Sequence, residues 1–110
     1  MTRIAICGAA GRMGRALIHA IDARTDVSLA AAIERTGSSL IGADAGEMAA
    51  LPAKGILINQ SLASQIDMVD IVIDFTSPES TVANIALCRQ ERKGIVIGTT
   101  GLSEDQKHLL

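Results

Sequence analysis

Aromatic residues are almost absent from this chain of 110 residues, which has one Phe and no Trp or Tyr. Proteins that bind single-stranded nucleic acid stack the bases on aromatic side chains, and this sequence offers no such platform. The formal net charge is −2, so the chain also lacks the basic surface that holds a phosphate backbone. We expect no nucleic-acid partner.

Long apolar runs are missing as well. The continuous apolar stretches are far shorter than the ~20 residues that a membrane-spanning helix needs. The first residues, MTRIAIC, begin a strand-like run directly and show no pattern of a signal peptide. We therefore expect no membrane association.

Cysteine and histidine are scarce, with two residues of each. Cys7 lies in an apolar run and Cys88 in a helical stretch, and their spacing is not that of a metal site, so we expect reduced, buried thiols. His19 and His108 have no partner at a spacing typical of metal binding or of a catalytic triad. We expect no metal site and no catalytic residue in this chain.

What the sequence does contain is a regular alternation of short apolar runs and helix-period stretches. With 48% hydrophobic and 20% charged residues, the composition is that of a globular domain. The predicted helices are residues 13–23, a segment from Ser77 to before Gly94, and a segment beginning at Ser103. The predicted strands are residues 3–7, 27–34, 55–58 (a weak one), 69–75 and 93–98. This order predicts an α/β fold with a doubly wound, mainly parallel sheet, the Rossmann type of dinucleotide-binding domain, over residues 1–110.

Two predicted helices carry clear start signals. Ser77 can cap the first, and Pro78 suits its first position. Ser103 followed by Gln106 matches a capping box for the second. The second helix has barely begun when the sequence stops at Leu110, so we expect a domain that is truncated at its C-terminus.

Three glycines follow the first predicted strand in the segment AICGAAGRMGRAL. Gly8 allows a sharp turn off the strand, Gly11 leaves the backbone bare for a pyrophosphate, and Gly14 lets the following helix pack closely. The N–H groups at the start of that helix can then bind the phosphates. The spacing departs from the commoner G-x-G-x-x-G, because Ala10 stands where the second glycine usually falls.

Two charged residues at the end of the second strand fit such a site. Glu34 lies 20 residues beyond Gly14, where an acidic side chain can accept hydrogen bonds from the adenosine ribose. Arg35 can bind a 2′-phosphate, so the pair is compatible with either NADH or NADPH. The alternative is a solvated charged pair that merely ends a strand. Arg12 likewise either adds charge to the phosphate loop or faces solvent in the first helical turn.

A second glycine-containing loop, GTTG from Gly98 to Gly101, follows the last predicted strand. Ligands of parallel sheets bind outside the carboxyl ends of the strands, and this loop, DFTSPE and the first glycine loop all fall at that edge. A bare backbone with hydroxyls beside it suits a nicotinamide ring. The alternative is a plain loop that leads into a capped helix.

The segments GAAGRMGR, GSSLIGADAGE, IDFTSPE and LCRQERKGIVIGTTG, in this order, resemble the N-terminal cofactor domain of the dihydrodipicolinate reductase family, also called 4-hydroxy-tetrahydrodipicolinate reductase. The resemblance covers nearly all of the chain. It implies an NADH- or NADPH-dependent reductase that acts on a cyclic intermediate of bacterial lysine and diaminopimelate biosynthesis. It also implies a cytoplasmic homotetramer.

The resemblance also implies where the cofactor binds. The pyrophosphate would lie on Gly8, Ala9, Ala10, Gly11, Arg12 and Met13, the ribose on Glu34, and a 2′-phosphate on Arg35. Phe75, within the DFT motif, and the run Gly98, Thr99 and Thr100 would lie at the cofactor, the latter beside the nicotinamide. Ser77 stands where the family often has Arg, so that cationic contact is missing here.

The family's substrate-binding residues, in a His-His…Lys signature, belong to a second domain that this sequence does not contain. We therefore expect this chain to bind the cofactor without turnover, and to be a monomer or a weak oligomer. Two other hypotheses remain: a free-standing NAD(H)-sensing module, and the cofactor domain of another nicotinamide dehydrogenase. The segment GSSLIGADAGE is either a mobile flap or a packed loop.

Overall fold

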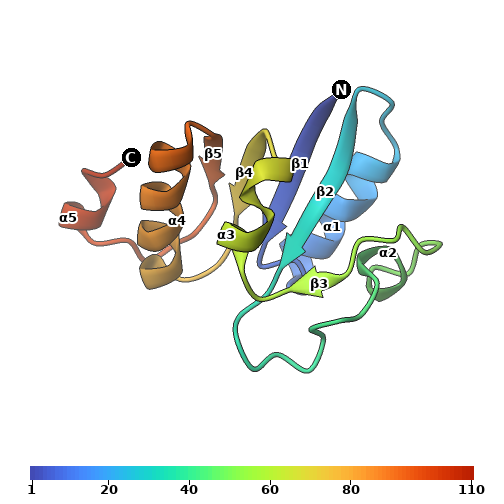
Figure 1. Cartoon of the computed structure of the whole chain (residues 1–110). Coiled ribbons are helices and arrows are strands. Elements are labelled where there is room, and N and C mark those ends of the chain that lie inside the picture. Colours follow the sequence, from blue (N-terminus) through green and yellow to red (C-terminus); the bar gives the residue numbers. More distant parts are fainter.

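A five-stranded parallel sheet forms the centre of the computed structural model, which describes all 110 residues (Figure 1). The sheet order is β3-β2-β1-β4-β5, and every strand pair is parallel, as predicted. The strands are β1 (Thr2–Cys7), β2 (Val27–Ile33), β3 (Ile58–Asn59), β4 (Ile71–Asp74) and β5 (Gly94–Ile97). The chain progresses in one direction from β1 to β3 and then returns to place β4 on the other side of β1. The carboxyl ends of β1 and β4 therefore flank the crevice where such folds bind ligands.

Helices lie on both faces of this sheet. The elements are α1 (Arg12–Asp22), α2 (Ala45–Met48), α3 (Leu62–Gln65), the 3₁₀ turn η1 (Ile66–Met68), α4 (Pro78–Glu91) and α5 (Glu104–Lys107). Alternate residues of β1 point to opposite faces of the sheet. Ile4 and Ile6 pack with α1 and α2 on one face, whereas Ala5 and Cys7 pack with α3, η1 and α4 on the other. This alternation is the period of a strand, and it gives the domain two hydrophobic cores that share one sheet.

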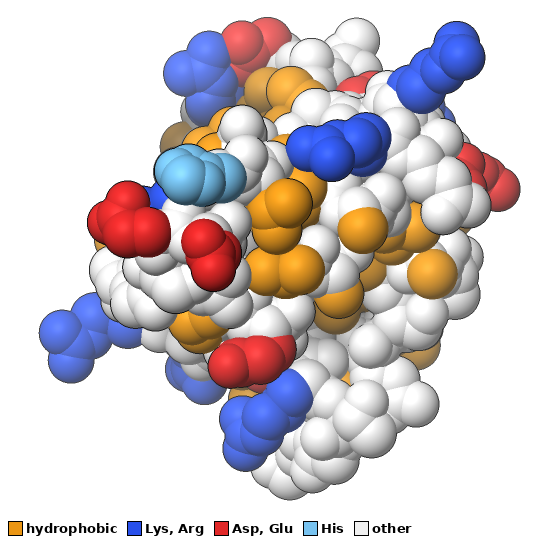
Figure 2. Space-filling model, turned by 90° about the vertical axis from the view of Figure 1, so that its left-hand side faces the viewer, with side chains coloured by type: hydrophobic (Ala, Val, Ile, Leu, Met, Phe, Trp, Pro, Cys, Tyr) orange, Lys and Arg blue, Asp and Glu red, His pale blue; other side chains and the backbone are white.

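The cover is incomplete over β5. Its Ile95 packs into the core beneath α4, but Val96 on the opposite face is 56% exposed. An apolar sequence such as that of β5 is typical of a strand covered on both faces, but within this chain one face of β5 is open. Figure 2 views this end of the molecule and shows apolar side chains lying open among charged ones.

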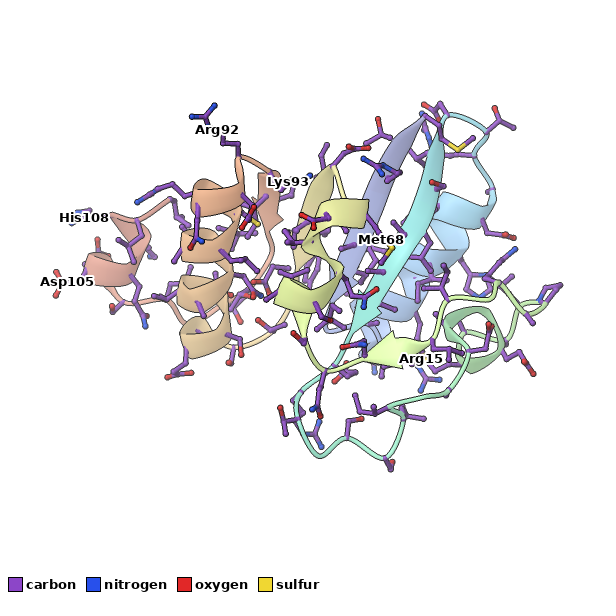
Figure 3. All side chains as sticks on the ribbon, in the orientation of Figure 1. Arg15, Met68, Arg92, Lys93, Asp105 and His108 are labelled. Atoms are coloured by element: carbon purple, nitrogen blue, oxygen red, sulfur yellow. The ribbon has the colours of Figure 1, made fainter.

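The predicted helix caps are confirmed. Ser77 accepts a hydrogen bond from the N–H of Ser80 at 3.3 Å, and Pro78 occupies the first turn of α4. Ser103 and Gln106 form the reciprocal capping box of α5. At the other end of α4, Arg92 adopts a left-handed conformation with φ 58°, and its side chain points away from the molecule (Figure 3).

One local prediction was wrong, and one short helical segment was missed. The third strand was expected at residues 55–58 and is found at Ile58–Asn59, where it pairs with Ala32 and Ile33 of β2. The α3–η1 segment had not been predicted at all, because it contains only one helical turn followed by a 3₁₀ turn. Runs this short carry too few apolar repeats to show a period.

The segment GSSLIGADAGE is a packed loop rather than an open flap. Asp44 caps α2 through the N–H of Glu47 and also accepts from the N–H groups of Lys54 and Gly55, at 2.8–3.1 Å. These donors hold the pKa of Asp44 below its usual value, the Glu47 N–H having the largest effect. A Cβ at Gly46 would overlap the Pro52 carbonyl oxygen, so the backbone at Gly46 is in direct contact with the backbone at Pro52.

None of the helices combines the length and the apolar character that crossing a membrane requires.

Candidate functional site

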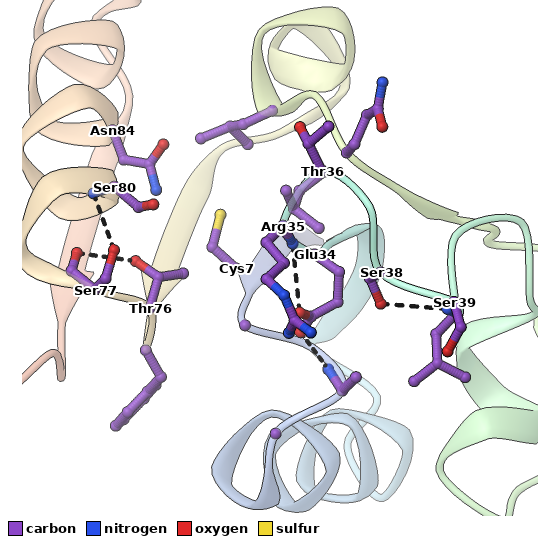
Figure 4. A pocket seen from close by; sticks show the side chains of 18 residues that line it. Cys7, Glu34, Arg35, Thr36, Ser38, Ser39, Thr76, Ser77, Ser80 and Asn84 are labelled. Carbon is purple, nitrogen blue, oxygen red and sulfur yellow. Dashed lines mark hydrogen bonds between the residues drawn. The ribbon is translucent and has the colours of Figure 1, made fainter.

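A cleft of about 730 Å³ opens at the carboxyl edge of the sheet, between the ends of β1 and β2 and the start of α4 (Figure 4). Its position is the topological switch point of the strand order. The lining residues are Cys7, Gly8, Ala10, Gly11, Ile33, Glu34, Arg35, Thr36, Ser38, Ser39, Leu40, Gln60, Leu62, Phe75, Thr76, Ser77, Ser80 and Asn84.

Two of the three glycines in the first loop are required by the fold itself. Gly8 has φ +84°, and a Cβ there would overlap the carbonyl oxygen of Phe75. A Cβ at Gly14 would overlap the carbonyl oxygen of Gly8 and lie 2.6 Å from that of Ala9. Gly8 thus lets β1 and β4 approach at their ends, and Gly14 lets α1 start directly against the loop.

Gly11 is different, because the protein alone leaves room for a side chain there. The nearest atom to a Cβ at Gly11 is the Gly8 carbonyl oxygen at 3.4 Å, and the backbone is in an ordinary extended conformation with φ −71°. Gly11 lines the cleft, so an added side chain would project toward whatever the cleft binds. Just beyond it, the N–H groups of Arg12, Met13 and Gly14 have no acceptor within the chain. A bare backbone with free N–H groups fits a pyrophosphate.

Glu34 is bound to the same loop. Its Oε2 accepts a hydrogen bond from the Ala10 N–H at 2.9 Å, and Oε1 accepts from the Arg35 N–H at 3.4 Å (Figure 4). Glu34 forms no ion pair with Arg35, whose side chain is exposed at the cleft. The alternative of a solvated charged pair therefore does not describe Glu34, because its carboxylate is fixed between the glycine loop and the cleft.

On the other side of the cleft, Phe75 joins the glycine loop to the GTTG loop. Its carbonyl oxygen lies against Gly8, and a Cβ at Gly98 would overlap its ring. Its N–H donates to the Cys7 carbonyl oxygen at 3.0 Å. The single aromatic residue of the chain therefore lies between the two loops that the sequence predicted to meet.

The structure brings only some of the predicted residues to the cleft. Gly8, Ala10, Gly11, Glu34, Arg35 and Phe75 line it. Ala9 is fully buried beneath the loop, and Arg12 and Met13 are exposed in the first turn of α1. Gly98 lies against the ring of Phe75 and Thr99 is hydrogen-bonded to Thr76, but neither of them nor Thr100 lines the cleft.

Polar residues on two sides of the cleft were not predicted from the sequence. Ser38 and Ser39 come from the loop after β2, and no spacing in the sequence marks them. Ser80 and Asn84 come from α4, where they follow Ser77 by three and seven residues. That helical spacing puts all three on one face, and it was the signal that could have found them.

The two cysteines are buried, as the sequence predicted, and the two histidines lie in different surroundings. Cys7 and Cys88 are both buried and unbonded to each other. Burial is the main cause that raises the pKa of both thiols, and nearby Asp74 adds to it. His19 forms a hydrogen bond to the Ala49 carbonyl oxygen, and His108 lies at the periphery of the molecule (Figure 3). No group of three or more metal-ligating side chains is present.

The family described as "Dihydrodipicolinate reductase, N-terminus" matches residues 2–110. The chain belongs to this family. A curated 4-hydroxy-tetrahydrodipicolinate reductase from Hahella chejuensis (strain KCTC 2396) is 58% identical over 110 residues, which is 100% of this chain and 41% of that protein. The chain therefore spans about two fifths of the length of this family member.

Solved structures with the same fold include a member of this family. A dihydrodipicolinate reductase from Paenisporosarcina sp. TG-14, with dipicolinate bound, is 28% identical and superposes with a TM-score of 0.75 over 98% of this chain and 41% of that one. An amine dehydrogenase from Mycobacterium smegmatis shares the fold at 18% identity, with a TM-score of 0.71 over 87% of this chain and 29% of that one. The fold is thus one that family members share with more distant dehydrogenases.

Proposed function

We propose that this chain is the NADH- or NADPH-binding domain of a 4-hydroxy-tetrahydrodipicolinate reductase. The observation that carries the proposal is Gly11, a glycine on the cleft wall that the fold itself does not need. Membership of the family and the 58% identity to a reductase of that name support the same activity. The nicotinamide, when bound, supplies the hydride for the reduction.

Each part of the dinucleotide has residues of this chain that suit it. The free N–H groups of Arg12, Met13 and Gly14 suit the pyrophosphate, with the positive end of the α1 dipole behind them. Glu34, held at the loop by Ala10, suits the adenosine ribose, and Arg35 suits a 2′-phosphate. The loop Gly98–Thr100, packed against Phe75, suits the nicotinamide end.

The remaining properties of the whole enzyme belong to this proposal. The substrate is a cyclic intermediate of lysine and diaminopimelate biosynthesis, held by residues outside these 110. The full-length protein is cytoplasmic and homotetrameric. This chain alone binds the cofactor without turnover and is monomeric or weakly associated, which size-exclusion chromatography with light scattering would measure.

Calorimetric titration of the chain with NADH and then NADPH tests the proposal. We expect both to bind. Gly11→Val should weaken both cofactors by about tenfold or more, because its side chain enters the space of the pyrophosphate while the fold has room for it.

Charge variants then separate the two ends of the adenosine site. Glu34→Ala should weaken NADH, and Arg35→Ala should weaken NADPH alone. Glu91→Ala, at the far end of α4, is the matched control and should change neither affinity. The proposal would be refuted if the folded chain bound neither cofactor and the full-length gene product bound neither as well.

A further inference from the structure

Asp74, the last residue of β4, is a fully buried carboxyl group with no cation beside it. Its exposed fraction is 0%, and none of the ion pairs of the chain includes it. Burying a carboxylate without a cation costs free energy unless hydrogen bonds replace its water.

Four donors surround the two oxygens of Asp74. Oδ1 accepts from the N–H of Thr76 at 3.0 Å, from the Thr76 hydroxyl at 2.6 Å and from the Thr99 hydroxyl at 3.3 Å. Oδ2 accepts from the Nδ2 group of Asn84 at 3.0 Å. The donors come from the loop after β4, from α4 and from the loop after β5, so one side chain ties three segments together.

Thr99, one of these four donors, is itself held by two further hydrogen bonds. Its hydroxyl oxygen accepts from the Thr76 N–H at 3.0 Å and from the hydroxyl of Thr81, which is itself fully buried, at 2.7 Å. With its own hydrogen directed to Asp74, the Thr99 hydroxyl makes every hydrogen bond available to it. The loop that contains Thr99 is thereby fixed against the end of β4, with Gly98 on the ring of Phe75.

We propose that Asp74 is the positioning residue of the nicotinamide end of the site. Asp74 does not line the cleft, and it acts through Thr99 and Thr76 to hold the Gly98–Thr100 loop beside Phe75. The inference rests on the proposed function, because it assigns this loop to the nicotinamide. It distinguishes the two halves of the dinucleotide: Asp74 governs the nicotinamide half, and the Gly11 and Glu34 wall governs the ADP-ribose half.

The test compares the affinities of NADH and of ADP-ribose, which lacks the nicotinamide, for the parent chain and for Asp74→Asn. The amide places an N–H₂ group where one carboxylate oxygen now accepts, so one donor must face another. We expect NADH to bind about tenfold more weakly, the equivalent of one lost charge-assisted hydrogen bond, with ADP-ribose unchanged within about twofold. A purely structural role would weaken both ligands alike.

Asp70→Asn is the matched control, since it makes the same substitution just before β4 at the opposite edge of the sheet, and it should change neither affinity. If Asp74→Asn does not fold, as judged by circular dichroism, Thr81→Val decides, because it removes a hydrogen bond to Thr99 without altering charge. It should weaken NADH alone, by a smaller factor. The inference is overturned if the affinities for NADH and ADP-ribose fall equally, or if neither falls. A parent chain that binds neither ligand overturns the proposed function as well.

Discussion

The two walls of the cleft are built in opposite ways. The wall formed by the glycine loop and Glu34 consists mainly of backbone, with Gly8 and Gly14 packed against carbonyl oxygens and Gly11 left bare. The opposite wall, with Thr76, Ser80 and Asn84, consists of side chains, and behind it hydroxyls and an amide are arranged around the buried Asp74. Where the backbone wall is packed against carbonyl oxygens, at Gly8 and Gly14, it tolerates no added atoms, whereas a side-chain wall tolerates a change of shape better than a change of hydrogen-bonding capacity.

The largest expected effect comes from filling the backbone wall. Gly14→Ala places a methyl group onto the carbonyl oxygens of Gly8 and Ala9, and backbone atoms cannot turn aside as a side chain can. We expect the free energy of unfolding to fall by ~3 kcal/mol, the upper end of the usual range for overpacking. Urea denaturation followed by circular dichroism measures it. Gly11→Ala is the control in the same loop, and its free energy of unfolding should stay within about 0.5 kcal/mol of the parent value. Equal losses in the two variants would show that the fold does not distinguish Gly14 from Gly11.

A smaller effect is expected where a glycine faces a side chain. Gly98→Ala places its methyl group on the ring of Phe75, which can turn away. We expect a loss of about 1 kcal/mol in the free energy of unfolding, together with a change in the chemical shifts of the ring. Because Phe75 is the only aromatic residue, its ring protons can be assigned without selective labelling. Unchanged ring shifts in Gly98→Ala would show that the two groups are not in contact.

The smallest effect concerns the second aspartate near β4. Asp70, just before the strand, is paired with Arg3 at 3.0 Å on the surface, and that partner lowers the pKa of Asp70 to about 2. Because the carboxyl pKa is about 3.9 in the unfolded chain, the stabilisation is fully present above pH ~4 and is lost as the pH falls toward 2. The pair is exposed, so the contribution is small and is screened by salt.

Thermal unfolding of the parent and of Asp70→Asn at several pH values measures this contribution. The difference in Tm between them should be constant from pH 7 to about 5 and should shrink toward pH 2. A difference that grew on acidification would contradict the assignment of the low pKa to the Arg3 contact.

The sequence predicted the backbone wall and missed most of the side-chain wall, for a physical reason. The spacing of Gly8, Gly11 and Gly14, with Glu34 beyond them, reflects steric demands that few other residues meet, so it is specific. Asp74, Thr81 and Asn84 are ordinary polar residues whose roles depend on which segments fold together. Nothing in their spacing indicates that Thr99, from another loop, completes their hydrogen bonds.

The fold shows the same division. The four longer strands and helices α1 and α4 follow from apolar periodicity and caps, and all were predicted close to their observed positions. Segments set by tertiary contacts were not. The strand Ile58–Asn59 is fixed by pairing with β2, and the exposure of Val96 depends on what lies over β5 rather than on its own apolar character.

The position of Cys7 has a consequence for how motion in this molecule can be observed. Its thiol forms part of the cleft floor yet is only 1% exposed, in a strand held on both sides by its neighbours. Burial raises the pKa of Cys7, so the reactive thiolate forms only when the floor opens to water. The rate at which Cys7 is alkylated therefore reports how often the cleft floor opens locally. Any molecule that binds in the cleft and covers Cys7 should lower that rate.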